Sequence, residues 1–128
     1  MVQQLTWEAF LALHLVGRDL VNDDRKLCGG IARGPITAIN ASDGRIDIRQ
    51  RWVADLKDPL APAAQQRWRF LRNETGGSVD PAYAQPPVMH PDGRIEFTIP
   101  YCGTATILPL EDRLDPTKVE GLPAQSAA

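Results

Sequence analysis

Asp43-Gly44-Arg45-Ile46-Asp47-Ile48 joins a turn dipeptide to a stretch in which polar and apolar residues alternate. Asp92-Gly93-Arg94-Ile95-Glu96-Phe97 repeats this arrangement 49 positions later. An Asp-Gly pair supplies the positive φ that a tight hairpin needs, and alternation with a period of two is typical of a half-buried strand. The sequence therefore predicts two turns that each lead into a strand. The residues around the two copies match poorly, which favours independent use of a good turn over an internal duplication.

The alternation divides both predicted strands into a dry face and a wet face. In the strand predicted over 45–56, the dry face, which points to the core, holds Ile46, Ile48, Trp52, Ala54 and Leu56. The wet face, which points to solvent, holds Arg45, Asp47, Arg49, Arg51 and Asp55. Gln50 is the one polar residue that interrupts the dry face. In the strand predicted over 94–100, the dry face holds Ile95, Phe97 and Ile99. One wet face per strand is typical of an antiparallel sheet.

The spacing of strands and turns predicts a mostly β (α+β) fold. Eleven prolines and ten glycines favour short elements, and no strand–helix–strand alternation supports a parallel sheet. We expect an antiparallel meander of about six to eight strands that closes into a barrel-like shape, because closure removes exposed strand edges. The Gly- and Pro-rich segment 73–91 is predicted to be the longest loop.

A short N-terminal helix is predicted over 6–16. Thr6 is a suitable N-cap, Leu and Ala dominate the segment, and Gly17 is suited to its end. Apolar residues also alternate from Leu5 to Leu15, which leaves a strand open as the alternative. With 128 residues, the chain fits one compact domain over 1–114, followed by a polar, partly disordered tail over 115–128.

The net charge of −2 is unevenly distributed along the chain. Residues 33–72 carry eight cations and four acids, whereas residues 73–128 carry three cations and eight acids. We expect these two parts to pair with each other within one fold, and a pI near 5.6 is far from that of a typical nucleic-acid domain.

The location is expected to be cytoplasmic, without a membrane partner. No apolar run reaches transmembrane length, and the N-terminus lacks the pattern of a secretion signal. Cys28 and Cys102 are then expected to be reduced thiols, and their pairing stays open if the compartment is oxidising.

No local motif supports catalysis, and the sequence disfavours an enzyme without excluding one. His14 and His90 are isolated, and neither the histidines nor the cysteines have zinc spacing, so no metal and no cofactor are expected. The stretch Gly29–Gly34 lacks the Gly-Lys-Ser/Thr continuation and the following helix of a phosphate loop.

The first functional hypothesis is a non-enzymatic domain that binds a small apolar or amphipathic ligand in its interior, or that acts as an interaction module. Small barrels fill their centre with side chains or leave room for one ligand, and a solid core is the competing interpretation. The candidate ligand-binding residues are Trp52, Trp68, Phe70, Phe97, Tyr101, Gln50 and Arg33.

One short segment resembles a known family. Leu15-Val16-Gly17-Arg18-Asp19-Leu20-Val21, which follows the predicted helix, resembles the opening of lipocalin-like barrels over about seven residues. Those families carry a Trp two places after the glycine, where this chain has Asp19. The resemblance implies a barrel with an internal ligand site.

The second functional hypothesis is binding of nucleic acid or another polyanion along two arginine-bearing strands, 45–55 and 67–72. Its candidate residues are Arg45, Arg49, Arg51, Arg67, Arg69 and Arg72. Basic strands interleaved with aromatics can bind single strands, but the alternation places Trp52 and Trp68 on the face opposite their neighbouring arginines. A homodimer through an exposed edge strand over Gly29–Ile39 is a further expectation.

Overall fold

The computed structural model describes residues 1–26, 30–54, 56–63, 68–71, 75–82, 84–100 and 103–114. These residues form one antiparallel sheet in the order β1-β6-β7-β8-β2-β3-β4-β5. The strands are β1 (Gln3–Gln4), β2 (Asp19–Asp23), β3 (Ile31–Ile39), β4 (Ile46–Val53), β5 (Thr75–Val79), β6 (Val88–Met89), β7 (Ile95–Ile99) and β8 (Gly103–Ile107). The prediction of a mostly β, antiparallel fold is confirmed.

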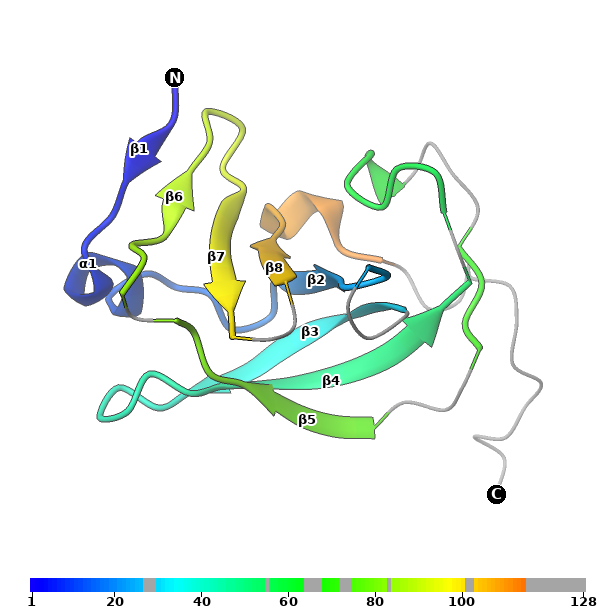
Figure 1. Ribbon diagram of the computed structural model, residues 1–128, viewed down its shortest axis with the longest axis horizontal. Coiled ribbons are helices and arrows are strands. Elements are labelled where there is room, and N and C mark those ends of the chain that lie inside the picture. The colour runs from blue at the N-terminus through cyan, green and yellow to red at the C-terminus, as the bar shows by residue number, and fades with distance from the viewer. Residues whose placement is uncertain are drawn as a thin grey trace.

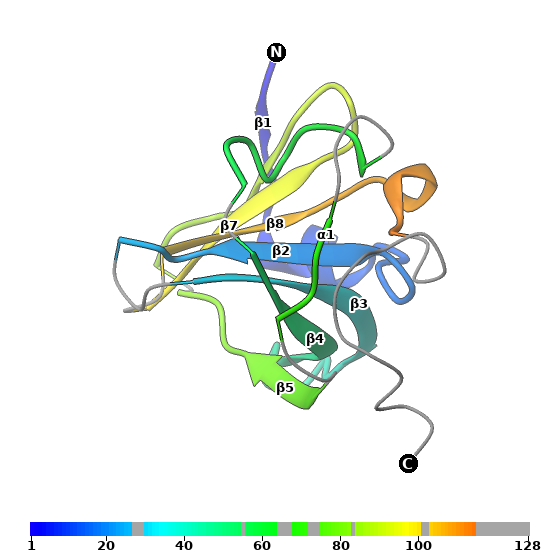
Figure 2. The ribbon, with the colours of Figure 1, turned by 90° about the vertical axis from the view of Figure 1, so that its right-hand side faces the viewer.

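The sheet bends strongly but does not close into a barrel. β1, β6, β7 and β8 form the upper part and β3, β4 and β5 the lower part, with β2 between them (Figure 1). Seen from the side, the strands fan from β7 through β2 to β5 (Figure 2). β1 and β5 are the two edges of the sheet, and a backbone hydrogen bond of 2.8 Å from Ala82 N to Thr98 O links the chain after β5 to β7. Barrel closure is therefore not confirmed.

Both Asp-Gly turns form, and they share one side-chain hydrogen bond, although the first closes between Asn40 and Arg45 and the second between His90 and Arg94. The Asp43 and Asp92 carboxylates each accept a hydrogen bond of 3.0 Å from the backbone N of the arginine two residues later. Gly44 and Gly93 have φ values of 75° and 94°, which a side chain would disfavour. The turns lead into β4 and β7, as predicted from the repeated phrase.

The helix is shorter than the predicted 6–16. α1 spans Trp7–Leu11, and Thr6 Oγ1 caps it by accepting from Ala9 N at 3.0 Å. The chain then leaves the helix and buries Leu15 in the same core as Phe10. Five helical residues have little stability of their own, so this tertiary contact determines where the helix ends.

The core consists of two clusters on opposite faces of the sheet, and not of one shared interior. The first cluster lies on the concave face together with α1 and contains Leu5, Phe10, Leu15, Leu20, Ile36, Ile46, Ile48, Ile95, Phe97, Ile99, Ala105 and Ile107. The second contains Val21, Ile31, Val53, Trp68, Phe70 and Leu108. Trp68 and Phe70 therefore belong to the opposite face from Phe97. Neighbouring strand residues such as Leu20 and Val21 point to opposite faces, and both are buried, Leu20 in the first cluster and Val21 in the second.

Two expectations about strands are wrong. The predicted loop 73–91 contains β5 and β6, which pair with β4 and β7 respectively. The predicted edge over Gly29–Ile39 contains β3, which is paired on both sides by β2 and β4. A dimer through that strand is therefore not available, because its hydrogen-bonding groups are already used. Cys28, Cys102 and the tail over 115–128 lie outside the described residues.

Candidate functional site

A pocket of about 530 Å³, here called the arginine pocket, opens on the face of the sheet opposite to α1. It is lined by Gly17, Asp19, Arg33, Gly34, Pro35, Arg49, Arg51, Phe70, Arg113 and Leu114. The register places Asp19 opposite Pro35 and Arg33 opposite Arg51, so neighbouring strands present these side chains to the same face. The pairing of β2, β3 and β4 thus builds the floor of this pocket.

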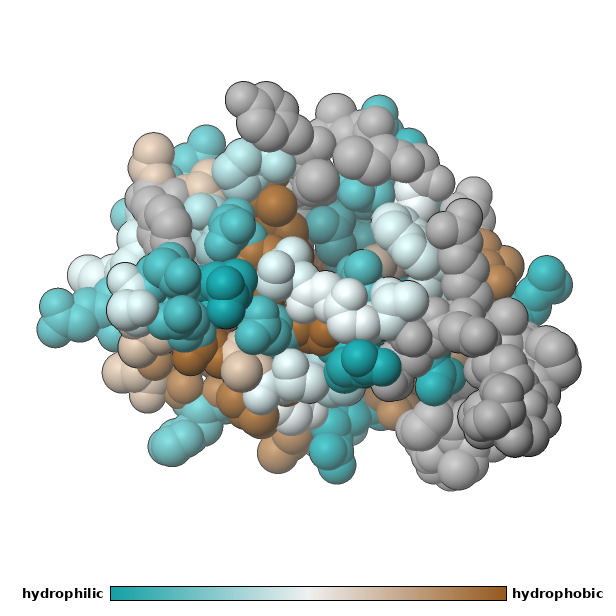
Figure 3. Space-filling model, turned by 90° about the horizontal axis from the view of Figure 1, so that it is seen from below, coloured by the Kyte–Doolittle hydropathy of each residue, from teal (hydrophilic) through white to brown (hydrophobic). Residues whose placement is uncertain are grey.

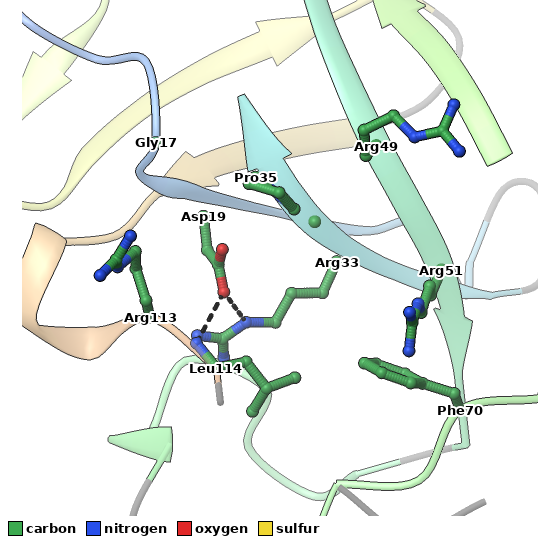
Figure 4. A pocket seen from close by; sticks show the side chains of 10 residues that line it. Gly17, Asp19, Arg33, Pro35, Arg49, Arg51, Phe70, Arg113 and Leu114 are labelled. Carbon is green, nitrogen blue, oxygen red and sulfur yellow. Dashed lines mark hydrogen bonds and ion pairs between the residues drawn. The ribbon is translucent and has the colours of Figure 1, made fainter. Parts of the chain in front are cut away.

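A buried ion pair lies at the base of the arginine pocket. Arg33 Nε donates to Asp19 Oδ2 at 2.8 Å, and the two side chains are 1% and 6% exposed. Figure 4 shows Asp19 and Arg33 between Arg113 on one side and Arg51 with Phe70 on the other. Charges this deeply buried require partners, and each of these two side chains provides one for the other.

The same ion pair holds the segment that follows β8. Arg33 Nη2 donates to Asp112 O at 2.6 Å, and Leu114 N donates to Asp19 Oδ2 at 3.0 Å. Asp112 lies in a short 3₁₀ turn, Leu110–Asp112, and its Oδ1 accepts from Ala63 N at 2.7 Å. This segment covers one side of the pocket because the ion pair supplies a donor and an acceptor for its backbone.

Aromatic rings cover the guanidinium groups of two arginines. Arg33 Cζ lies 4.5 Å from the centre of the Trp68 ring, and Arg51 Cζ lies 4.4 Å from the centre of the Phe70 ring. Trp68 and Phe70 are buried, whereas Arg69 between them is exposed, as the alternation predicted. Cation–π contacts of this kind hold guanidinium groups in fixed positions at little cost in solvation.

Two hydrogen-bond donors at this place have no partner among the described residues. They are Arg33 Nη1 and Trp68 Nε1, and both atoms are buried. Buried donors without acceptors are rare in folded proteins and each one calls for an explanation. Both are donors, so the group that would satisfy them is an acceptor.

The described lining of the arginine pocket is strongly positive. Arg33, Arg49, Arg51 and Arg113 contribute four positive charges, and Asp19 contributes the one carboxylate among these lining residues. Arg33 and Arg51 are directly opposite each other on neighbouring strands, where like charges repel. This arrangement favours a negatively charged occupant.

A second pocket, here called the tryptophan pocket, lies on the concave face and has a volume of about 460 Å³. Its lining residues are Asn22, Asp24, Ala32, Ile48, Gln50, Trp52, Ser78, Val79, Asp80, Ile99 and Pro100. The α1 end of this face is filled by the first core cluster, whereas Trp52 and Gln50, further along β4, are only partly buried. The concave face is therefore solid at the α1 end and hollow beyond Ile48.

The predicted ligand-binding residues are divided between different places. Arg33 and Phe70 line the arginine pocket, and Trp68 packs behind it. Trp52 and Gln50 line the tryptophan pocket. Phe97 lies in the solid core, with its ring centre 5.8 Å from that of Phe10. Tyr101 lies outside the described residues.

The predicted polyanion-binding arginines do not all lie together. Arg49 and Arg51 line the arginine pocket. Arg45 is exposed just before the first residue of β4, and its Nε lies 3.2 Å from Asp47 Oδ1. Arg69 is exposed outside the pocket lining, and Arg67 and Arg72 lie outside the described residues. The structure thus brings two of the six predicted arginines to one pocket with Arg33 and Arg113.

Sequence reasoning missed Asp19, Arg113 and Leu114 as parts of the arginine pocket, and Asp24 as part of the tryptophan pocket. Asp19 stands where lipocalin-like barrels carry a Trp, and this difference was the one signal that could have drawn attention to it. No local pattern marked Arg113 and Leu114, because hydrogen bonds of Asp112 to Arg33 and of Leu114 to Asp19, 79 and 95 positions earlier, hold this segment.

Two charged groups near the ends of β2 have shifted pKa values and serve the fold. Burial lowers the pKa of Arg18, and Glu111 opposes this shift. Arg18 donates to Leu108 O at 2.7 Å and to Gly93 O at 2.8 Å. At the other end, hydrogen bonding from the Arg25 side chain holds the pKa of Asp23 below its usual value. Neither Arg18 nor Asp23 lines a described pocket.

Other chemistry has little support in the described parts of the chain. No group of three or more His, Cys, Asp or Glu side chains within the described ranges could hold a metal ion. His90 Nε2 lies 2.7 Å from Glu96 Oε1 in the β6–β7 hairpin, whose turn contains Asp92 and Gly93. His14 is exposed. On the face seen in Figure 3, the described hydrophobic residues lie among hydrophilic ones.

Comparison with known proteins adds no assignment: no family model matches the chain, and neither the curated proteins nor the solved structures give a match. Within the described residues, none of the helices has the length and apolar character needed to cross a bilayer.

Proposed function

We propose that this protein binds a small amphipathic anion, a carboxylate or phosphate with an apolar part, in the arginine pocket. The observation that carries the proposal is Arg33 Nη1, a buried cationic donor without a hydrogen-bond partner among the described residues, in a pocket of ligand size. A carboxylate or phosphate oxygen is the acceptor that a guanidinium binds best.

The shape of the pocket supports a compact ligand with an apolar part. Phe70, Pro35 and Leu114 provide apolar surface beside the arginines. Pockets that bind small molecules combine apolar walls with a few polar groups that fix the orientation. The four described arginines of the lining share one pocket, which favours a small anion over a polymer.

Binding of benzoate and hexanoate, each compared with its neutral amide, tests the charge requirement. We expect the carboxylates to bind and the amides to bind at least about 10-fold more weakly, because an ionic hydrogen bond contributes about 1.5–3 kcal/mol. Isothermal titration calorimetry at two salt concentrations measures this difference. Equal affinity for acid and amide would contradict the proposal.

Two substitutions locate the site. We expect Arg51→Gln and Arg113→Gln each to weaken carboxylate binding about 10-fold, whereas Arg45→Gln changes it less than about 2-fold. Arg45→Gln is the matched control because it removes the same charge from the residue just before β4, the strand that carries Arg51, and Arg45 is outside the pocket lining. An equal loss from Arg45→Gln would show that only the overall charge matters.

A short oligodeoxynucleotide, titrated in parallel, tests the polyanion alternative. A polymer that follows an extended surface would lose affinity with Arg45→Gln and Arg69→Gln as much as with Arg51→Gln, and its binding would fall steeply with salt. That result would replace the small-anion proposal by the alternative.

A further inference from the structure

The tryptophan pocket differs from the arginine pocket in position and in charge. Asn22, Ala32 and Trp52 are register partners across β2, β3 and β4, so they share the concave face, opposite to Asp19, Arg33 and Arg51. The described lining of the tryptophan pocket contains Asp24 and Asp80 and no Lys, Arg or His. The two pockets therefore present opposite charges on opposite faces of one sheet.

Asp24 is the most informative residue of the tryptophan pocket. It is 6% exposed, and its carboxylate accepts one long hydrogen bond, 3.3 Å, from Gly30 N. Among the described residues it forms no ion pair, unlike Asp19 and Asp23, the first and last residues of β2. A buried carboxylate without a counter-ion is costly, and a cation in the adjacent pocket would remove that cost.

Trp52 and Gln50 are held in position by close packing against glycine. A Cβ at Gly30 would lie 2.6 Å from Trp52 Cζ3, and a Cβ at Gly77 would lie 3.1 Å from Gln50 Nε2. A side chain at either glycine would therefore crowd Trp52 or Gln50. The small Ala32 is opposite Trp52 on the neighbouring strand, which leaves space beside the indole ring.

We propose that the tryptophan pocket is a second ligand site that takes an organic cation, an alkylammonium or quaternary ammonium group. The cation pairs with the Asp24 carboxylate and lies against the Trp52 indole, whose ring face attracts cations more strongly than that of other aromatics. Ile48, Val79 and Ile99 provide apolar surface for the alkyl part, and Gln50 and Asn22 provide polar contacts. This site does not depend on the anion site on the other face.

Binding of choline, compared with its neutral isostere 3,3-dimethylbutan-1-ol, tests the inference. We expect choline to bind and to shift the NMR signal of one indole N–H group, and Trp52→Phe identifies that signal by its loss. We expect the neutral alcohol to bind at least about 10-fold more weakly. Equal affinity for the two molecules, or a shift confined to another indole signal, would overturn the proposal.

Asp24→Asn and Asp23→Asn form a matched pair of variants. Asn at position 24 keeps an acceptor for Gly30 N and removes the charge, and we expect choline to bind at least about 10-fold more weakly. Asp23 is the neighbouring residue and is paired with Arg25, so Asp23→Asn should change the affinity less than about 2-fold. Unchanged affinity in Asp24→Asn, or an equal loss in Asp23→Asn, would overturn the proposal.

A further variant covers the case in which Asp24→Asn fails to fold, as judged by its amide spectrum. Trp52→Leu removes the aromatic face and keeps the charge, and we expect it to weaken choline binding about 5-fold or more while hardly changing the affinity for the neutral alcohol. Arg51→Gln should leave choline binding unchanged, because Arg51 lies on the opposite face. Choline affinity that is insensitive to Trp52→Leu would refute the site.

Discussion

Asp19→Ala is expected to lower the free energy of unfolding by about 3–5 kcal/mol, because it leaves a buried charge without its partner. Arg33 is 1% exposed, and its Nε donates to Asp19 at 2.8 Å. The substitution also removes the acceptor of Leu114 N, so the segment that covers the arginine pocket loses a contact with the sheet. Urea unfolding, followed by circular dichroism, measures the loss.

Asp47→Ala is the control for Asp19→Ala. Asp47 also pairs with an arginine, Arg45, but the two side chains are 39% and 44% exposed. We expect this substitution to cost about 0–1 kcal/mol, as exposed ion pairs contribute little. Equal losses from Asp19→Ala and Asp47→Ala would show that the buried pair does not hold the fold.

The double variant Asp19→Leu with Arg33→Met separates the cost of an unpaired charge from the value of the pair. We expect it to be more stable than Asp19→Leu alone, because no buried charge then remains. A double variant that is less stable than either single variant would contradict this explanation.

Gly34→Ala is expected to cost about 3 kcal/mol or more, at or above the upper end of the range for overpacking. A Cβ at position 34 would overlap the carbonyl oxygen of Arg49 and crowd Gln50 Cα. These are backbone atoms of the paired strand β4, so they cannot move aside without separation of β3 from β4. Chemical denaturation measures the cost, and the separated strands should also show faster amide exchange.

Gly76→Ala is the matched control for Gly34→Ala. Gly76 lies in the edge strand β5, and the nearest atom to its Cβ would be Arg49 Nη1, at 3.2 Å, at the end of a flexible side chain. We therefore expect a change within about 1 kcal/mol. A loss at position 76 as large as that at position 34 would show that glycine is needed there for another reason.

The strands that the sequence revealed are those with a local pattern. Along β7 the residues Ile95, Phe97 and Ile99 are buried and their neighbours are partly exposed, as the alternation predicted. β5 was missed because Thr-Gly-Gly-Ser-Val has no alternation. It forms because β4 offers it a partner strand, and a contact between distant segments leaves no pattern within either of them.

The prediction of the ligand-binding residues was also limited to what a local pattern can show. Alternation correctly placed Trp52 on the face of Ile46 and Ile48, and Arg51 on the other face. It could not show that this face is solid at the α1 end and hollow beyond Ile48, because that depends on where α1 and its neighbours pack.

The sequence by itself determined the turns at Asp43-Gly44 and Asp92-Gly93, the buried face of β7, the opposite faces of Trp52 and Arg51 in β4, and the capped start of α1. These features depend on the chemistry of adjacent residues. Only the tertiary structure decided that Arg33 meets Asp19 and Arg51, and that Asp24 lies in a pocket with Trp52. Strand register and the packing of distant segments determine these contacts. The residues involved are far apart in the sequence, so no local pattern relates them.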